Sequence, residues 1–179
     1  MGLSHDDWHA KLETAAQKRN GHPLPEDFFE SLDSYVRQRF ESELHPILGV
    51  RGAVSNLELM CCVASSTPLP SLQWKLEHTG IADLFSPHIF SADMVDRGKP
   101  APDLFLHAAT TLGIEPRHCI VVEDSANGVI AGKAAGMKVI GFTGGDHCLD
   151  DQEAILMGAG AVVVIDDFAN LGLAISRLN

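Results

Sequence analysis

From residue 49 onward, short apolar runs alternate with segments of helical pattern. The apolar runs lie at residues 60–64, 89–91, 119–122, 138–142 and 161–165. Helical patterns lie between them, and Gly113 and Gly136 stand where two of the helices would end. Short buried strands that alternate with helices are typical of a parallel sheet covered on both faces. The sequence therefore predicts an α/β fold for residues 47–179.

Residues 1–46 have a different pattern. Two helices are expected there, separated by Asn-Gly-His-Pro at residues 20–23, with Pro25 in the first turn of the second helix. From Phe28 to Leu44, apolar residues recur at spacings of three and four. One apolar face of this kind predicts a helical hairpin that packs on another part of the protein.

The charge of the chain argues against two classes of partner. Its formal net charge is −11, from 24 acidic and 13 basic residues, and Lys and Arg do not cluster. Nucleic acid and anionic membrane surfaces are therefore not expected as partners. No apolar run approaches the length of a membrane span, and no signal peptide is recognised at the start of the sequence.

The four cysteines predict thiols rather than a metal site. Cys61, Cys62, Cys119 and Cys148 do not make the paired CxxC spacing of a zinc site. The first three lie in apolar runs, where buried thiols are expected. Reduced thiols favour a reducing compartment, and the cytoplasm is the simplest expectation.

Polar side chains follow the predicted strands, which is where an open parallel sheet binds its ligands. Glu123 and Asp124 come directly after one apolar run. Two adjacent carboxylates at that place suit Mg²⁺, which takes oxygen ligands and retains waters. An equally good interpretation is a helix start at which Asp124 or Ser125 caps free N–H groups, and the two roles are compatible.

Lys99 and Ser65 are candidates whose individual signals are weaker. Pro100 and Pro102 stiffen the loop that carries Lys99, so its ammonium could be aimed at a phosphate. A solvated loop lysine is the more common case for a lysine taken alone. Ser65 follows another strand and could hold a phosphoryl oxygen, although Ser-Ser-Thr-Pro at 65–68 is also ordinary turn sequence.

Other motifs predict structure rather than chemistry. Gly128, Gly132 and Gly136 recur every fourth residue, which predicts a bare helix face that packs closely on the sheet. Gly144 and Gly145 lack the GxGxxG spacing of a dinucleotide loop, and no GxSxG sequence is present. The histidines at positions 88, 107 and 147 are not spaced like ligands of a shared metal ion.

Together, three segments resemble the second, third and fourth motifs of the haloacid dehalogenase (HAD) superfamily. In chain order they are Val-Ala-Ser-Ser at 63–66, Arg-Gly-Lys-Pro-Ala-Pro-Asp at 97–103 and Val-Val-Glu-Asp-Ser-Ala-Asn-Gly at 121–128. The residues that follow, 131–142, are similar to the subgroup that contains β-phosphoglucomutase and small sugar-phosphate phosphatases. The resemblance implies a Rossmann-type α/β core at 47–179 and a partial helical cap at 1–46.

The resemblance also implies a phosphoryl-transfer site that uses Mg²⁺. Ser65 would bind the transferring phosphoryl oxygens, and Lys99 would pair with them and with the nucleophile. Asp124 would ligate Mg²⁺, with Glu123 ordering its waters or sharing that task. The further phosphate or substrate contacts would be Ser66, Thr67 and Asn127.

The first motif of the family is not found. It is a strand ending in Asp-x-Asp, whose first Asp attacks phosphorus and whose second serves as general acid and base. The Asp pairs at 6–7, 150–151 and 166–167 do not fit that position. The strand is central in the family's sheet, so without it its neighbours would stand about 10 Å apart, too far to pair. We therefore expect a truncated chain that is inactive alone and marginally stable, unless the gap closes or another chain fills it.

Three functions fit these features. The leading one, for the complete protein, is an Mg²⁺-dependent phosphatase of a small phosphorylated metabolite such as a sugar phosphate. A phosphosugar mutase is the catalytic alternative, and it would need cap residues that retain a bisphosphate intermediate. A non-catalytic binding or assembly module is favoured by the missing nucleophile, whereas the retained Ser65, Lys99, Glu123 and Asp124 argue against it.

Overall fold

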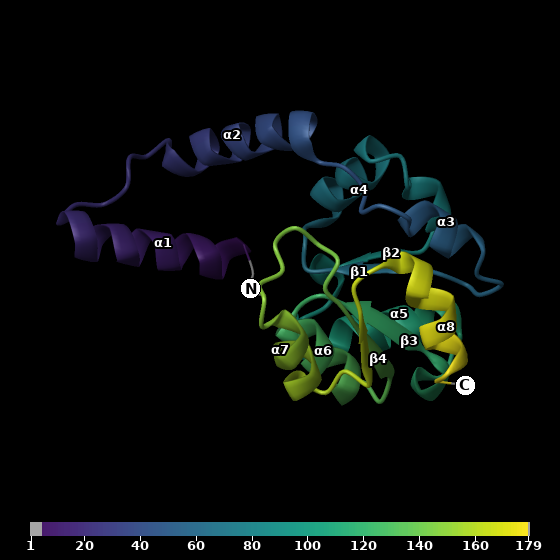
Figure 1. Ribbon diagram of the computed structural model, residues 1–179. Coiled ribbons are helices and arrows are strands. Elements are labelled where there is room, and N and C mark those ends of the chain that lie inside the picture. Colours follow the sequence, from purple (N-terminus) through teal and green to yellow (C-terminus); the bar gives the residue numbers. More distant parts are fainter. Residues whose placement is uncertain (1–4, 179) are drawn as a thin grey trace. The chain divides into compact units, whose positions relative to one another are not determined.

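The computed structural model describes residues 5–178, and the chain divides into two compact units (Figure 1). One unit ends at His45 and the other begins at Pro46. Between residues 5 and 178, we find no helix with both the length and the apolar character of a bilayer span.

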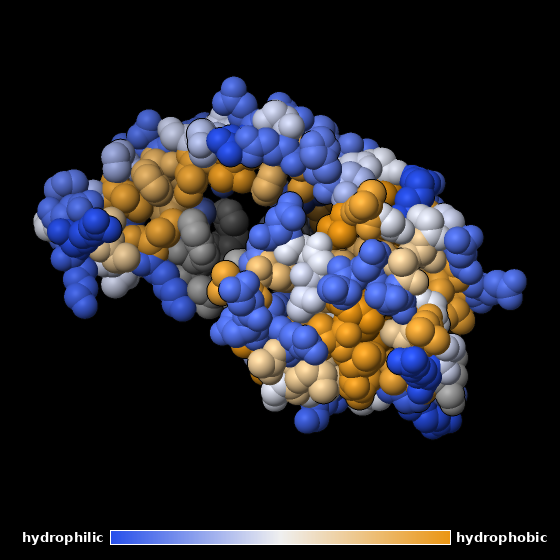
Figure 2. Space-filling view, viewed as in Figure 1, coloured by the Kyte–Doolittle hydropathy of each residue, from blue (hydrophilic) through white to orange (hydrophobic). Residues whose placement is uncertain are grey.

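The first unit is a pair of helices, α1 (His5–Asn20) and α2 (Phe28–Glu43). The rings of His9 and Phe29 stack at a centroid distance of 3.9 Å, which joins the two helices. Figure 2 shows the hydrophobic residues of the hairpin gathered on the side of α2 that faces α1. No residue of α2 is buried, however, so the predicted apolar face is incompletely covered within this unit. Pro25 lies in the turn before α2 rather than in its first turn.

The second unit contains all five predicted strands among six helices, which confirms the α/β class. The strands are β1 (Val63–Ser65), β2 (Ile89–Ser91), β3 (Ile120–Glu123), β4 (Lys138–Phe142) and β5 (Val163–Ile165). The helices are α3 (Val50–Ser55), α4 (Leu69–His78), α5 (Asp103–Leu112), α6 (Ala126–Ala134), α7 (Gln152–Ala159) and α8 (Leu171–Ser176). β1 is shorter than the apolar run at 60–64 predicted, because pairing with β2 begins only at Val63.

The strands form two separate parallel sheets (Figure 1). One contains β1 and β2, and the other has the order β3-β4-β5. β1 and β3 are not paired with each other. The absence of pairing between these two strands agrees with the sequence-based expectation.

Helices cover both faces of the three-stranded sheet. Val139 on β4 packs with Leu156 of α7, and both side chains are fully buried. The next residue, Ile140, points to the opposite face and packs with Leu171 and Ile175 of α8. This alternation is the two-residue period of a strand that is buried on both sides.

Helix α5 connects the cores of the two sheets. Leu104, which is fully buried, packs with Phe90 of β2. The neighbouring Phe105 belongs to the cluster that contains Val121 of β3 and Val129 of α6. Successive residues of one helix therefore contact both sheets, which holds them in one folded unit although no strand pairing joins them.

The cysteines are free thiols, and the three in apolar runs are only partly buried. Burial raises the pKa of the Cys62 thiol to about 11, with smaller contributions from the neighbouring Cys119 and Cys61. The Cys62 thiol therefore stays protonated at neutral pH. The sequence predicted buried thiols, whereas these three are intermediate in exposure. Cys61 and Cys62 precede β1, which begins only at Val63.

The structure predicts opposite effects for two helical glycines. A Cβ on Gly132 would lie 2.7 Å from Cγ2 of Val139, whereas a Cβ on Gly158 would meet nothing within 4 Å. Gly158→Ala should raise the free energy of unfolding by about 0.5–1 kcal/mol, because alanine favours the helix. Gly132→Ala should lower the free energy of unfolding by about 1 kcal/mol, because the clash of the new methyl group with Val139 costs more than the helix preference of alanine contributes. Urea unfolding of both variants checks this, and equal stabilisation would contradict the close packing of α6 on the sheet.

Candidate active site

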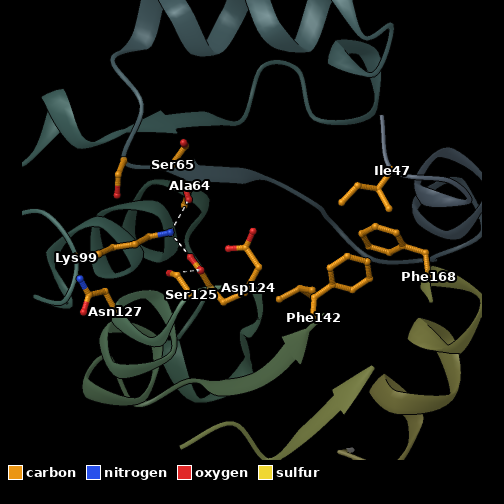
Figure 3. A pocket seen from close by; sticks show the side chains of 12 residues that line it. Ile47, Ala64, Ser65, Lys99, Asp124, Ser125, Asn127, Phe142 and Phe168 are labelled. Carbon is orange, nitrogen blue, oxygen red and sulfur yellow. Dashed lines mark hydrogen bonds and ion pairs between the residues drawn. The ribbon is translucent and has the colours of Figure 1, made fainter. Parts of the chain in front are cut away.

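A cavity of about 420 Å³ lies between the carboxyl ends of β1 and β3 (Figure 3). Ala64, Ser65 and Ser66 line it from the side of β1, and Val122, Glu123 and Asp124 line it from the side of β3. The remaining lining residues are Ile47, Lys99, Ser125, Asn127, Phe142 and Phe168. Six of the seven predicted site residues therefore line one cavity, and Thr67 is the exception.

Lys99 crosses the space between the two sheets. Its Nζ donates a hydrogen bond to the Ala64 carbonyl on β1, at 3.1 Å, and forms an ion pair with Glu123 on β3. The side chains of Lys99 and Glu123 are only 8% and 9% exposed. The ammonium also lies 4.7 Å from the centroid of the Phe105 ring, within the range of a cation–π contact. This lysine is thus a buried, oriented cation rather than a solvated loop residue.

The Glu123 carboxylate has partners for both oxygens. Oε1 pairs with Lys99, and Oε2 accepts a hydrogen bond from the Ser125 hydroxyl at 3.1 Å. Ser125 Oγ in turn accepts the Gly128 N–H at 3.1 Å and caps α6. A Cβ on Gly128 would overlap the Glu123 carboxylate. Gly128, expected to pack on the sheet, therefore makes room for this carboxylate instead.

Asp124 is the more accessible of the two adjacent acids. Its side chain is 46% exposed, and Oδ2 lies 3.1 Å from Nε2 of His147. Mg²⁺ commonly uses one or two protein carboxylates and completes its shell with waters and phosphate oxygens. Asp124 fits that requirement as a single ligand, whereas both oxygens of Glu123 are engaged. Within residues 5–178, no group of three His, Cys, Asp or Glu side chains could hold a metal by itself.

The loop after β1 orients Ser65. Ser65 Oγ accepts the Thr67 N–H at 3.1 Å, and the Thr67 carbonyl accepts the hydroxyl of Ser91 at 2.9 Å. Ser91 is fully buried at the end of β2. Thr67 therefore fixes the position of Ser65 through its backbone, which sequence reasoning did not anticipate.

The other half of the cavity is apolar. Figure 3 shows Ile47, Phe142 and Phe168 opposite the polar group around Lys99. The rings of Phe142 and Phe168 stack with centroids 4.4 Å apart. These residues carried no sequence signal, because they come from distant segments and resemble ordinary core residues. His147 was missed for a similar reason, since only the fold places it against Asp124.

Comparison with known proteins gives a family match over most of the chain. The family model described as haloacid dehalogenase-like hydrolase matches residues 2–136. A 6-phosphogluconate phosphatase of Escherichia coli is 33% identical over 63% of this chain and 51% of that protein. A phosphorylated carbohydrates phosphatase of Thermotoga maritima is 32% identical over 78% of this chain and 64% of that protein. The chain spans between 14% and 53% of the length of the first four curated relatives.

Solved structures agree with the family match. A haloacid dehalogenase-like protein from Agrobacterium tumefaciens has a TM-score of 0.84 and 34% identity, covering 94% of this chain and 77% of that chain. A HAD family hydrolase from Deinococcus radiodurans, solved with bound phosphate and sodium, has a TM-score of 0.80 and 31% identity. It covers 99% of this chain and 77% of that chain. The predicted fold class is thus matched by chains of known structure.

Removing the cation of the buried Lys99–Glu123 pair should destabilise the fold strongly. A second substitution that removes the charge of Glu123 should restore part of the lost stability. Lys99→Met should lower the free energy of unfolding by about 3 kcal/mol, because it leaves the Glu123 carboxylate buried without its cation. Adding Glu123→Gln should recover at least half of that loss. Arg51→Met, which breaks an exposed pair with Asp83, should cost less than about 1 kcal/mol. Urea unfolding checks all three, and a Lys99→Met cost as small as that of Arg51→Met would refute this role of the pair.

Proposed function

We propose a function on the premise that this chain belongs to the haloacid dehalogenase-like hydrolase family, as the match over residues 2–136 establishes. The chain carries phosphate-binding residues of a phosphatase that acts on a small phosphorylated metabolite, such as a sugar phosphate. Relatives named as phosphatases of 6-phosphogluconate, hexitols and phosphorylated carbohydrates support this choice. The mutase alternative gains less support, because these curated relatives are named as phosphatases.

One observation carries the proposal. An ammonium, a hydroxyl and an accessible carboxylate, from Lys99, Ser65 and Asp124, line the same cavity at the ends of parallel strands. An open α/β sheet binds ligands at this position. A phosphate monoester needs positive charge and hydrogen-bond donors around its oxygens as the transferring group leaves. The cavity offers both within one small volume.

Each residue has a distinct proposed task. Lys99 uses two of its three N–H donors on Ala64 and Glu123, and the third is directed to a phosphoryl oxygen. The Ser65 hydroxyl and the Asn127 amide bind the remaining oxygens. Asp124 holds Mg²⁺, which when bound offsets the negative charge of the phosphate. Glu123 holds the Lys99 side chain in place through their ion pair, so its task is positioning rather than metal ligation.

The proposed reaction has two steps and uses a carboxylate nucleophile. A carboxylate oxygen bonds to phosphorus while the P–O bond to the substrate alcohol breaks, and the departing alkoxide takes a proton from solvent water. Water then attacks the acyl phosphate, which releases inorganic phosphate and regenerates the carboxylate. The cavity-lining residues include two carboxylates, but Glu123 is paired with Lys99 and Asp124 is assigned to Mg²⁺. Neither is free to attack.

We therefore predict that purified residues 1–179 hydrolyse p-nitrophenyl phosphate with Mg²⁺ no faster than a buffer blank. The physical reason is that a bound phosphate would meet a cation and donors but no nucleophile. A continuous assay of p-nitrophenolate release checks the rate. Robust hydrolysis that disappears in Lys99→Ala would show that the site is complete as it stands.

Magnesium binding should depend on Asp124. In an isothermal titration with Mg²⁺ and inorganic phosphate, Asp124→Ala should weaken Mg²⁺ binding at least tenfold, because the site loses its protein carboxylate. Glu77→Ala, an exposed acid on α4, is the matched control and should leave the titration unchanged. Equal titrations for Asp124→Ala and the unmodified chain would favour a non-catalytic binding module.

A further inference from the structure

The loop that follows β1 lies beside the end of β2. The two strands pair in parallel with Ser65 opposite Ser91, so both segments leave the sheet at the same edge. The chain after Ser65 leads through residues 66–68 into α4. The chain after Ser91 forms a 3₁₀ turn at Ala92–Met94. This turn is therefore a neighbour of the loop that presents Ser65 to the cavity.

Ser91 holds this loop at Thr67. The Ser91 hydroxyl donates to the Thr67 carbonyl at 2.9 Å, and its oxygen accepts the Asp93 N–H at 3.2 Å. Ser91 is fully buried, and a buried hydroxyl group is costly to leave without hydrogen-bond partners. The Thr67 carbonyl is therefore tethered to the end of β2.

Asp93 holds the loop where it enters α4. Its Oδ2 accepts the N–H of Leu69, the first residue of the helix, at 2.8 Å. The first N–H groups of a helix lack intrahelical acceptors, and the helix dipole favours a carboxylate beside them. Pro68, which precedes the helix, makes no side-chain hydrogen bond there. Asp93 therefore caps α4 from a neighbouring segment.

The tethered loop determines which hydrogen-bonding role is left to Ser65. The Thr67 N–H donates to Ser65 Oγ at 3.1 Å. A serine hydroxyl has a single hydrogen, and an oxygen that receives a neighbouring N–H directs its own hydrogen elsewhere. While Thr67 is held in place, Ser65 is therefore a donor for an acceptor such as a phosphoryl oxygen.

We propose that Ser91 and Asp93 are positioning residues for phosphate binding, although both lie outside the lining of the cavity. Together they hold residues 65–69 in the conformation in which Ser65 donates to a phosphoryl oxygen. A loop without these tethers spends part of its time in other conformations, and the apparent affinity falls with the fraction of molecules that remain competent. The inference deepens the proposed function and rests on it for the identity of the ligand.

A pair of substitutions at Asp93 tests the tether at α4. Asn and Ala both remove the negative charge, but only the Asn side chain keeps an oxygen that can accept the Leu69 N–H. Asp93 is exposed, so both variants should fold. In isothermal titration with inorganic phosphate at saturating Mg²⁺, the dissociation constant of Asp93→Ala should be at least fivefold that of Asp93→Asn. Equal phosphate binding by the two variants would overturn the proposal.

Ser91→Ala tests the tether at Thr67. Its control is Ile175→Val, which also removes buried atoms, but from the apolar cluster around α8. Both variants should lower the free energy of unfolding. Only Ser91→Ala should raise the phosphate dissociation constant, by at least fivefold. An equal effect of the two variants on phosphate affinity would show that Ser91 serves stability alone, and would overturn its positioning role.

Amide exchange with solvent reports on the loop without any ligand. In the ¹⁵N-labelled chain, the Thr67 and Leu69 amides should exchange at least tenfold faster in Asp93→Ala than in Asp93→Asn. If the unmodified chain binds no phosphate, such faster exchange would uphold the tether and refute the proposed function. Unchanged exchange at both amides would overturn the tether, whatever the titration shows.

Discussion

The ion pair between Lys99 and Glu123 is the interaction on which the site depends. It links β3 to β1 through the Ala64 carbonyl, at a place where no strand pairing joins the two sheets. Burying two charges is costly unless each finds its partner and additional hydrogen bonds. Here Ser65 and Asp124 flank a cation whose position is fixed from both sides, so the cavity has a defined electrostatic centre before any ligand enters.

The residues around this pair are organised to support it. Ser125 donates to Glu123 and caps α6, and Gly128 leaves the space that the carboxylate occupies. On the opposite side, Phe105 of α5 lies against the ammonium. The same helix packs on both sheets, so the apolar core and the polar site share one supporting element. Stability and chemistry are therefore coupled at Lys99.

The sequence predicted those features that follow directly from the type and spacing of neighbouring residues. Apolar runs between helices predicted the five strands, and the combination of Lys99 with Glu123 and Asp124 predicted one shared cavity. Gly136, with φ of 76°, ends its helix as expected, because glycine tolerates that conformation. The absence of pairing between β1 and β3 was expected as well.

Features that depend on distant segments were not predictable. His147 meets Asp124 only because the loop after β4 returns to the end of β3, and no local spacing records this. The apolar half of the cavity comes from Ile47, Phe142 and Phe168, which are indistinguishable in sequence from core residues. Gly128 was assigned to packing on the sheet, because its contact with Glu123 depends on a side-chain direction rather than on periodicity.

Chemical-shift mapping with Mg²⁺ and inorganic phosphate shows whether Ser65, Lys99 and Asp124 act on one bound phosphate. A two-dimensional spectrum of the labelled chain should show the largest shifts at the Ser65, Asp124 and Asn127 amides and at the Lys99 side-chain amine, all with one shared dissociation constant. Shifts that are scattered over the surface, or that titrate with different constants at Ser65 and Asp124, would contradict a common site.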